Sequence, residues 1–361
     1  MLNRLLVTGG AGFIGANFVL HWLQQHPNSE VTVLDVLSYA GNRSNLHQVE
    51  TLENFSFVHG DICDQALLEE LLKQKAINCI VHFAAESHVD RSINAPETFI
   101  QNNVVGTQRL LQAAKKLWLD NSDKNKYGDI EHRFHHISTD EVFGSLSSSA
   151  PAFNENSNYQ PNSPYSASKA ASDHLVRAYQ QTYGLKCSLS YCSNNYGPRQ
   201  FPEKLIPLLI LNILQNKPLP IYGDGQQIRD WIHVNDHVRG IEQILLNGKA
   251  GQSYNLGANK EIKNIDLVSA VCKSMDQQFA ANKNFAQDFP EARAAIAGNS
   301  QSLIRHIQDR PGHDRRYALN TNKAKKELGF SSKIGFEQGI NDTINWYLNN
   351  KTWWRTILAV A

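Results

Sequence analysis

Val7-Thr8-Gly9-Gly10-Ala11-Gly12-Phe13-Ile14-Gly15 is a glycine-rich run between a short apolar stretch and a helical pattern. It satisfies GxGxxG at Gly10, Gly12 and Gly15, and GxxGxxG at Gly9, Gly12 and Gly15. Glycines there make a tight turn and let backbone amides approach a pyrophosphate, which the first N–H groups of the following helix also attract. The run therefore predicts a dinucleotide-binding loop between a first strand and a first helix.

Two acids that follow later strands bear on which dinucleotide binds. Asp35 ends the second expected strand, about 20 residues beyond the glycine run, where a carboxylate binds both ribose hydroxyls and repels a 2′-phosphate. This position favours NAD over NADP. Asp61 follows the third expected strand and either accepts a hydrogen bond from an adenine amino group or is a surface turn residue.

Short apolar runs alternate with helical patterns through the first two thirds of the chain. Within the runs, polar and apolar residues do not alternate, which is typical of strands buried on both faces of a parallel sheet. We expect an α/β fold, a Rossmann-type doubly wound parallel sheet. The expected strands are residues 5–8, 31–35, 55–58, 79–83, 134–139 and 188–191. A helix is expected to follow the glycine run and to end near residue 25, and further helices are expected at residues 65–75, 96–117 and 165–183.

Beyond residue 197 the pattern changes to prolines, isolated glycine turns and short mixed elements. We expect residues 1–197 to form an NAD-binding domain, to which segments near 230–260 return. Residues 198–361 are expected to form mainly a smaller mixed α/β C-terminal lobe that binds substrate. Residues 277–299 are rich in Ala, Asn and Gln, and their weak pattern fits either a helix pair or a mobile loop.

The composition argues against several classes of protein. A formal net charge of +1 over 361 residues gives no global field that would attract nucleic acid or a membrane. Five cysteines, an odd number without a CxxC pair, argue against a disulfide framework or a zinc site. The sequence has neither a signal-peptide pattern nor an apolar run of about 20 residues. We expect a cytoplasmic protein that binds no metal, nucleic acid or membrane.

Tyr165 and Lys169 form the next candidate site, because residues four apart share one face of a helix. A tyrosine that acts as a base near neutral pH needs its pKa lowered by about 3 units. A nearby ammonium and a positive nicotinamide ring together supply much of that shift. The spacing also occurs by chance on helix surfaces, so its weight comes from the glycine run and from Ser138 and Thr139 at a strand end upstream.

Asp140 and Glu141 directly follow the expected strand that ends at Thr139. Consecutive side chains on a regular strand point to opposite faces, so both acids reach one substrate only if the chain leaves strand geometry there. Gly144 and the Ser- and Pro-rich run up to residue 151 make such a departure plausible. By position alone, two solvated acids at a strand end are as good an interpretation as an acid–base pair.

These motifs resemble the extended, sugar-nucleotide branch of the short-chain dehydrogenase/reductase superfamily and, within it, the dTDP-glucose 4,6-dehydratase family. The resemblance runs from Thr8 to about Lys351. Four departures from the family pattern are Phe143, Tyr191, Gln200 and His233, of which Phe143 replaces a usual tyrosine and Tyr191 a smaller polar residue. The matching stretches are YAGN at 39–42, AAESHVDRS at 84–92, HHISTDEV at 135–142, SPYSASKA at 163–170, CSNNYGP at 192–198, FPEKLIP at 201–207, QIRDW at 227–231 and DRPGHD at 309–314.

The resemblance implies a lyase that converts dTDP-glucose to dTDP-4-keto-6-deoxyglucose and water through transient hydride transfer to bound NAD. Tyr165 would take the proton of the sugar 4-OH, and Thr139 would hydrogen-bond the 4-oxygen. Lys169 would hold the nicotinamide ribose and lower the pKa of Tyr165. Glu141 would remove the C5 proton, and Asp140, whose pKa we expect to be raised, would protonate the departing 6-OH.

The resemblance also implies ligand contacts and a homodimer. Subunits would pair through the helices expected over residues 96–117 and 165–183, although helices buried inside a monomer would show the same apolar pattern. Histidines 82, 135 and 136 are expected to be structural. The implied NAD contacts are Gly9, Gly12, Phe13, Ile14, Gly15, Asp35, Asp61, Ile62, Ala84, Ala85, Ser87, Asn103, Tyr165, Lys169 and Asn195, and the implied sugar-nucleotide contacts are Ser87, His88, Thr139, Asn194, Lys204, Leu205, Pro220, Tyr222, Arg229, Asn264, Arg310 and His313.

Three alternatives remain open at this point. The same reaction on UDP-glucose is the nearest, because one sequence does not distinguish thymine from uracil. A sugar-nucleotide 4-epimerase shares the glycine run and the Tyr165–Lys169 pair but has no need of Asp140 and Glu141. A non-catalytic NAD-binding module has no need of any of these four side chains.

Overall fold

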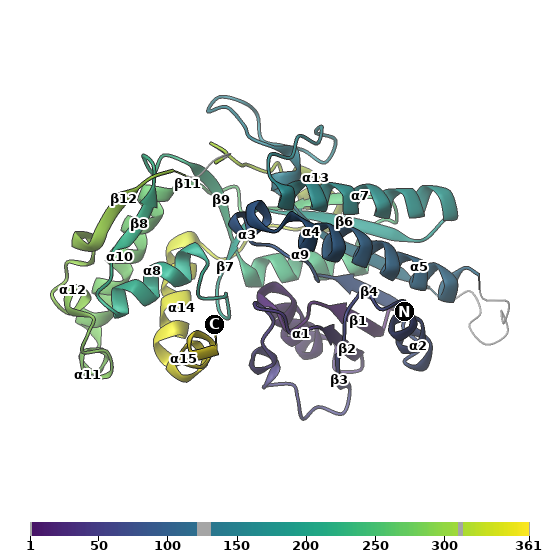
Figure 1. The fold of residues 1–361 in the computed structure, drawn as a ribbon, viewed down its shortest axis with the longest axis horizontal. Helices are drawn as coiled ribbons and strands as arrows, with labels where there is room; N and C mark the ends of the chain where they lie inside the picture. Colours follow the sequence, from purple (N-terminus) through teal and green to yellow (C-terminus); the bar gives the residue numbers. More distant parts are fainter. Residues whose placement is uncertain (1, 121–130, 310–312, 361) are drawn as a thin grey trace.

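The computed structural model describes residues 2–120, 131–309 and 313–360 (Figure 1). Its larger part is a seven-stranded parallel sheet with the strand order β10-β6-β5-β4-β1-β2-β3. The predicted Rossmann-type doubly wound sheet is thereby confirmed. The strands are Arg4–Thr8 (β1), Glu30–Asp35 (β2), Phe55–His59 (β3), Cys79–His82 (β4), Arg133–Thr139 (β5), Cys187–Cys192 (β6) and Ser253–Leu256 (β10).

Burial on both faces explains why the strands read as continuous apolar runs. All of β4 and β6 is buried, and β1 and β2 are buried or nearly so beyond their first residues. One face is covered by α1 (Phe13–Gln25), α9 (Val234–Asn247) and α13 (Asn322–Leu328), and the other by α2 (Gln65–Gln74), α5 (Thr107–Trp118) and α7 (Pro164–Tyr183).

The smaller lobe lies to the left in Figure 1 and has a core of its own. In it β8 pairs in parallel with β12, while a three-stranded sheet of β7, β9 and β11 lies toward the larger part. After β9 the chain returns to the central sheet through α9 and β10. The elements of the lobe are β7 (Asn194–Tyr196), α8 (Leu205–Leu214), β8 (Leu219–Tyr222), β9 (Ile228–His233), β11 (Glu261–Lys263), α10 (Asn264–Ala281), β12 (Ile304–Ile307), α14 (Phe336–Asn349) and α15 (Lys351–Val360).

The helix expected over residues 96–117 is not a uniform α-helix. It begins as α4 (Pro96–Phe99), widens into a π-helical stretch at Ile100–Gly106, and continues as α5. A Cβ atom at Gly106 would lie 2.6 Å from Cδ1 of Ile62, so a glycine lets this stretch pack against the loop after β3. Such widened turns occur often at functional sites.

Residues 277–299, for which the sequence left two interpretations open, form the end of α10 and two short helices, α11 (Asn284–Asp288) and α12 (Arg293–Ile296). Three buried phenylalanines, Phe279, Phe285 and Phe289, hold this segment against the lobe. The rings of Phe285 and Phe289 lie 6.0 and 6.5 Å from that of Phe279.

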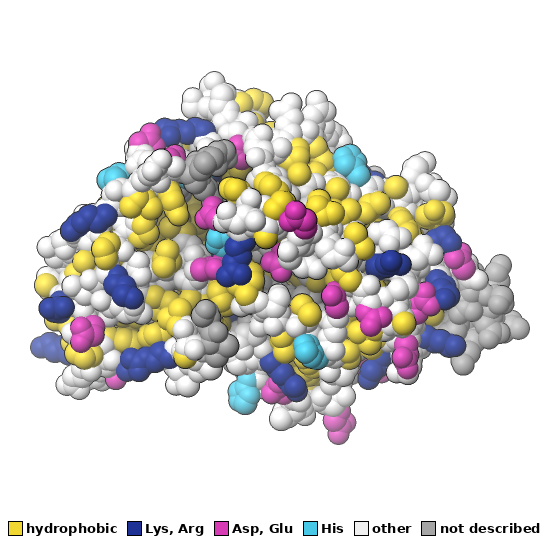
Figure 2. Space-filling view, in the orientation of Figure 1, with side chains coloured by type: hydrophobic (Ala, Val, Ile, Leu, Met, Phe, Trp, Pro, Cys, Tyr) yellow, Lys and Arg dark blue, Asp and Glu magenta, His cyan; other side chains and the backbone are white. Residues whose placement is uncertain are grey.

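Hydrophobic and charged side chains are interspersed over the face formed by α4, α5 and α7 (Figure 2). Within the described ranges, no helix is both long and apolar enough to span a membrane.

Candidate active site

The glycine run forms the turn between β1 and α1. Gly9 has a φ of 69°, and its amide donates to the carbonyl of Leu34 at 2.9 Å, which ties the turn to β2. A Cβ atom at Gly15 would lie 2.3 Å from the carbonyl oxygen of Gly9. Any side chain there would push α1 away from the turn. No side chain of the described residues caps the start of α1 at Gly12, so its first N–H groups are available to an anion.

Asp35 lies at the end of β2 beside this turn, with 7% of its surface exposed. Its carboxylate accepts from the amides of Ala11 at 2.9 Å and Leu37 at 2.8 Å. Burial nevertheless raises the pKa of Asp35, and the two amides and His59 oppose that shift. The carboxylate is thus fixed at the cavity wall with lone pairs left for ribose hydroxyls.

A cavity of about 340 Å³ extends from the glycine turn to the carboxyl ends of β5 and β6. Most of the predicted site residues line this cavity. Proteins with an open parallel sheet bind ligands at this place, outside the carboxyl ends of the strands. Asn194 Oδ1 and Asp140 Oδ2, both in its wall, are buried atoms that have no hydrogen-bond partner in the described part of the chain. The predicted residues in the wall are Gly9, Gly12, Phe13, Ile14, Gly15, Asp35, Asp61, Ile62, Ala84, Ala85, Ser87, Thr139, Asp140, Glu141, Tyr165, Lys169, Asn194, Asn195 and Lys204.

The remaining predicted contacts do not line this cavity. Asn103 lies behind the wall, where its amide bonds both the amide and the carbonyl of Glu86 and the hydroxyl of Ser168. Its place in the wall is taken by Asn102. His88, Leu205, Pro220, Tyr222, Arg229, Asn264 and His313 belong to the loops and lobe beyond the cavity, and Arg310 lies outside the described residues.

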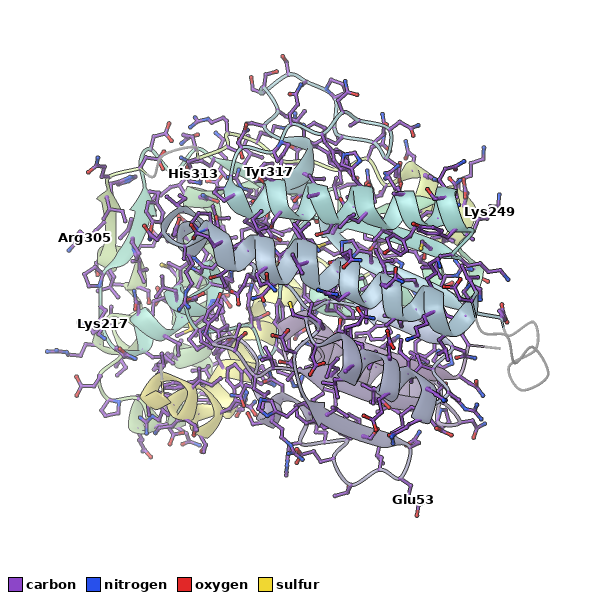
Figure 3. The ribbon with its side chains drawn as sticks, turned by 45° about the vertical axis from the view of Figure 1, so that its right-hand side comes forward. Glu53, Lys217, Lys249, Arg305, His313 and Tyr317 are labelled. Atoms are coloured by element: carbon purple, nitrogen blue, oxygen red, sulfur yellow. The ribbon has the colours of Figure 1, made fainter. Side chains whose placement is uncertain are left out.

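Arg229, which was expected to face a pyrophosphate, also holds backbone with its guanidinium. It donates to the carbonyls of Asp314 and Ile228 at 2.8 Å each, and it stacks 4.3 Å from the ring of Tyr317. In Figure 3, Tyr317 and His313 lie near the end of α7 that faces the smaller lobe. Arg229 therefore anchors the 314–317 segment near Glu141, at the end of the cavity formed by β5 and β6.

The acid doublet sits where β5 gives way to a short 3₁₀ helix, Asp140–Phe143. The Thr139 hydroxyl accepts from the Glu141 amide at 3.3 Å and so starts this helix. The chain thus leaves strand geometry directly after Thr139, and both acids line the same cavity. Gly144, with a φ of 85°, ends the helix where a Cβ atom would lie 2.4 Å from the carbonyl of Gln160.

Asp140 is 2% exposed. Burial is the main reason that its pKa lies well above the usual value, and the negative charges of Glu141 and Asp230 raise it further. This is the direction expected from the sequence. A carboxyl in that environment keeps its proton to a higher pH than an exposed one, which suits a proton donor.

The pKa of Tyr165 in the protein without ligand is shifted upward, whereas a base near neutral pH needs it shifted downward. Burial and the charge of Glu141 raise its pKa well above 10, and only a hydrogen bond with Thr139 opposes them strongly. The ammonium of Lys169, one turn further along α7, donates to the carbonyl of Ile137 at 2.8 Å and lies 3.2 Å from Nε2 of His136. A positive charge in the cavity beside the phenol would lower the pKa of Tyr165 and so favour its ionised form.

Three residues near the site were missed by the sequence reasoning. Asp173 is fully buried one turn after Lys169 on α7, and Asp230 acts on Asp140 from β9. Tyr317 lies close enough to Glu141 for that charge to raise its pKa. Asp173 had a sequence signal, its i+4 spacing from Lys169, whereas the other two approach only through the tertiary fold.

Comparison with known proteins gives consistent matches along nearly the whole chain. Residues 6–343 match the family model described as GDP-mannose 4,6 dehydratase. A dTDP-glucose 4,6-dehydratase of Escherichia coli is 47% identical over 98% of this chain and 96% of its own length.

Solved structures give the same result. DesIV, a dTDP-glucose 4,6-dehydratase of Streptomyces venezuelae whose crystal structure has NAD bound, matches with a TM-score of 0.85 and 44% identity, covering 98% of this chain and 99% of that one. A dTDP-glucose 4,6-dehydratase of Bacillus anthracis in complex with NAD matches with a TM-score of 0.81 and 39% identity, over 98% and 99% of the two chains.

Proposed function

The chain belongs to the GDP-mannose 4,6 dehydratase family, among its dTDP-glucose 4,6-dehydratases, and from this premise we propose that it dehydrates dTDP-glucose. It is an NAD-dependent hydro-lyase whose products are dTDP-4-keto-6-deoxyglucose and water. The reaction serves the synthesis of deoxysugars.

One observation carries this proposal beyond a generic NAD-binding fold. Asp140 and Glu141 line the same cavity as Tyr165 because the chain turns into a 3₁₀ helix directly after Thr139. A 4-epimerase only oxidises and reduces C4, so it needs neither acid. Removal of water across C5 and C6 needs one group to accept a proton and one to donate a proton.

The cavity residues fit NAD. The glycine turn, the start of α1 and the Asp35 carboxylate would hold its pyrophosphate and ribose, with Asp61 and Ile62 further along the same wall. When bound, NAD supplies an acceptor for the C4 hydride and a donor for its return to C6. Its positive ring would also face Tyr165, whose buried phenol needs a nearby positive charge to ionise.

We propose the following roles for the chain's own groups. Tyr165 Oη takes the proton of the 4-OH, and Thr139 Oγ1 donates to the 4-oxygen. Glu141 removes the C5 proton and later restores it. Asp140, the acid with the strongly raised pKa, protonates the departing 6-OH.

The sugar nucleotide would enter from the side of the smaller lobe. Ser87, Asn194 and Lys204 lie in the cavity wall, and Lys204 donates to the carbonyl of Ser87 at 3.2 Å. Tyr222 at the end of β8 and His313, whose rings are 6.2 Å apart, would hold the nucleotide. We propose an NAD-binding domain of residues 1–197, to which segments near 230–260 return, and a lobe formed mainly by residues 198–361.

We also propose a cytoplasmic homodimer. Helices α4, α5 and α7 would form the interface, and Ile100 at the start of the π-helical stretch exposes 51% of its surface there. The five cysteines are free thiols, as suits a reducing compartment.

The proposal is tested by incubating the purified protein with dTDP-glucose or UDP-glucose without added NAD and following the 4-keto-6-deoxy product. We expect product from dTDP-glucose. Product mainly from UDP-glucose would change the assigned nucleobase of the substrate from thymine to uracil. Formation of a 4-epimer would change the assigned reaction. Absence of any reaction in protein shown to contain NAD would refute the dehydratase proposal.

A further inference from the structure

Behind the cavity wall, Asp173 forms the centre of a polar cluster that the proposed reaction does not use. Its side chain is fully buried. Oδ2 accepts from the hydroxyl of Ser138 at 2.8 Å and from that of Tyr159 at 2.9 Å, while Oδ1 lies 3.3 Å from Nε2 of His136. These partners come from β5 and from the loop between β5 and α7, so two separate segments converge on this carboxylate of α7.

The cluster adjoins Lys169. Asp173 follows Lys169 by four residues on α7, which places both on one helix face. His136 Nε2 lies between them, 3.2 Å from the Lys169 ammonium and 3.3 Å from the Asp173 carboxylate. Because Lys169 is only 4% exposed, its charge depends on its protein neighbours rather than on water.

Among the described neighbours that act on Lys169, Asp173 is the one that carries charge. His82 and His136 have pKa values well below the ordinary value because they are buried, so both are neutral. The thiol of Cys192 is also neutral, because burial raises its pKa to about 12. Burial lowers the pKa of Lys169 to about 8, and Asp173 is the leading influence in the opposite direction.

A second set of contacts reaches Asp173 through Tyr159 rather than through His136. Arg177 donates to the Tyr191 hydroxyl at 2.7 Å, and the hydroxyls of Tyr191 and Tyr159 are 2.6 Å apart. With Arg177 as the first donor, each hydroxyl can accept from one side and donate to the other until Tyr159 donates to Asp173. Such a chain of donors stabilises a charged acceptor at its end. Burial raises the pKa of Asp173 to about 6, so the carboxyl is ionised at neutral pH.

One departure from the family pattern lies in this chain of donors, and another packs beside it. Tyr191 supplies one of its hydroxyls from a position where a smaller polar residue is usual. Phe143, where a tyrosine is usual, packs 4.8 Å from the Tyr191 ring and brings no hydroxyl.

We propose that Asp173 is a positioning residue that keeps Lys169 charged and oriented, and that Arg177, Tyr191 and Tyr159 in turn keep Asp173 ionised. The inference rests on the proposed function only where it connects Lys169 to catalysis. The charge state of Lys169 is a property of the protein without substrate.

A titration of Lys169 tests the proposal directly. The full chain with its bound cofactor is labelled with ¹³C at lysine Cε, and the Lys169 signal is identified by its absence in Lys169→Arg. The signal is followed by NMR from about pH 6 to 10 without substrate. We expect a midpoint near 8 in the parent protein. In Asp173→Asn the midpoint should fall by about one unit or more, which is a tenfold or larger change in protonation.

Three further variants separate this role from a structural one. Asp173→Glu should restore part of the shift. Tyr191→Phe should lower the Lys169 midpoint less than Asp173→Asn does. Tyr179→Phe is the matched control, because it removes a hydroxyl from α7 that bonds Gln112 instead, and it should leave the midpoint unchanged. If Asp173→Asn fails to fold, Tyr159→Phe and Tyr191→Phe decide the question, and unchanged midpoints in both would overturn the proposal.

Catalysis provides the second readout. The alkaline limb of kcat against pH should move down with the Lys169 midpoint, while KM for dTDP-glucose stays constant. A uniform loss of kcat with an unmoved Lys169 midpoint would show that Asp173 is only structural. A shifted midpoint in a protein that forms no 4-keto-6-deoxy product would support this inference and refute the proposed function, so the two failures are distinguishable.

Discussion

At the end of the cavity near α1, the groups offered to a ligand are mostly backbone amides, and their arrangement depends on the absence of side chains at Gly9 and Gly15. At the other end, the groups are the side chains of Asp140, Tyr165 and Lys169, each less than a tenth exposed. The first end binds by shape and by the direction of its N–H groups. The second end works through proton affinities, which burial shifts far from their ordinary values. Substitutions should therefore affect binding at one end and protonation at the other.

The largest effect should come from Glu141→Gln at the reaction end. The amide fills the same space but cannot take the C5 proton, so kcat should fall by about 10²–10⁴-fold. Oxidation at C4 does not require Glu141, so absorbance of reduced cofactor should appear when dTDP-glucose is added and should persist. Retention of NAD by the purified variant, measured after acid release, is the control. Normal product formation would exclude Glu141 as the base.

Gly15→Ala should have a smaller effect, and of a different kind. The added Cβ atom would meet the Gly9 carbonyl oxygen at 2.3 Å, so α1 must shift away from the turn, at a cost of about 1–3 kcal/mol typical of overpacking. We expect loss of bound NAD and a lower melting temperature. Gly335→Ala is the matched control, because nothing lies within 4 Å of its added Cβ atom. Full NAD retention by Gly15→Ala would contradict the assigned turn.

The smallest effect should be a dependence of stability on pH. The Asp140 carboxyl has a higher pKa when folded, so its contribution to stability is complete below 3.8 and is lost as pH rises through the raised value. Asp140→Asn should therefore gain stability relative to the parent protein as pH rises, in urea unfolding followed at several pH values. Asp224, an exposed acid whose pKa is lowered by Arg315, provides the opposite case. Its contribution is lost as pH falls, so Asp224→Asn should give the opposite slope.

The sequence predicted the backbone-built end more completely than the end built from side chains. The glycine run and Asp35 are local signals, and the strands on either side were predicted to within two residues. The need for Asp140 and Glu141 to leave strand geometry was also predictable, because it follows from the alternation of side chains on a strand.

The electrostatics of the reaction end were less predictable, since they depend on contacts between distant segments. Lys169 was expected to act on Tyr165, and the contacts of its ammonium with the Ile137 carbonyl and with His136 were not predicted. Arg229 was assigned to a pyrophosphate, and that it also holds the 314–317 segment was not predictable. The π-helical stretch before α5 was missed because a shift from i+4 to i+5 hydrogen bonds leaves the apolar pattern almost unchanged.

The place of β10 in the central sheet also has a consequence for how the protein is made on the ribosome. β6 is the inner neighbour of β10, yet about 60 residues of the chain separate the end of one from the start of the other. At a translation rate of about 5–20 residues per second, β6 emerges about 3–12 s before its partner exists. During that interval one edge of a fully buried strand is open to pairing with another chain. Rapid elongation through residues 193–252 should therefore favour soluble protein, and pauses there should favour aggregation of the nascent chain.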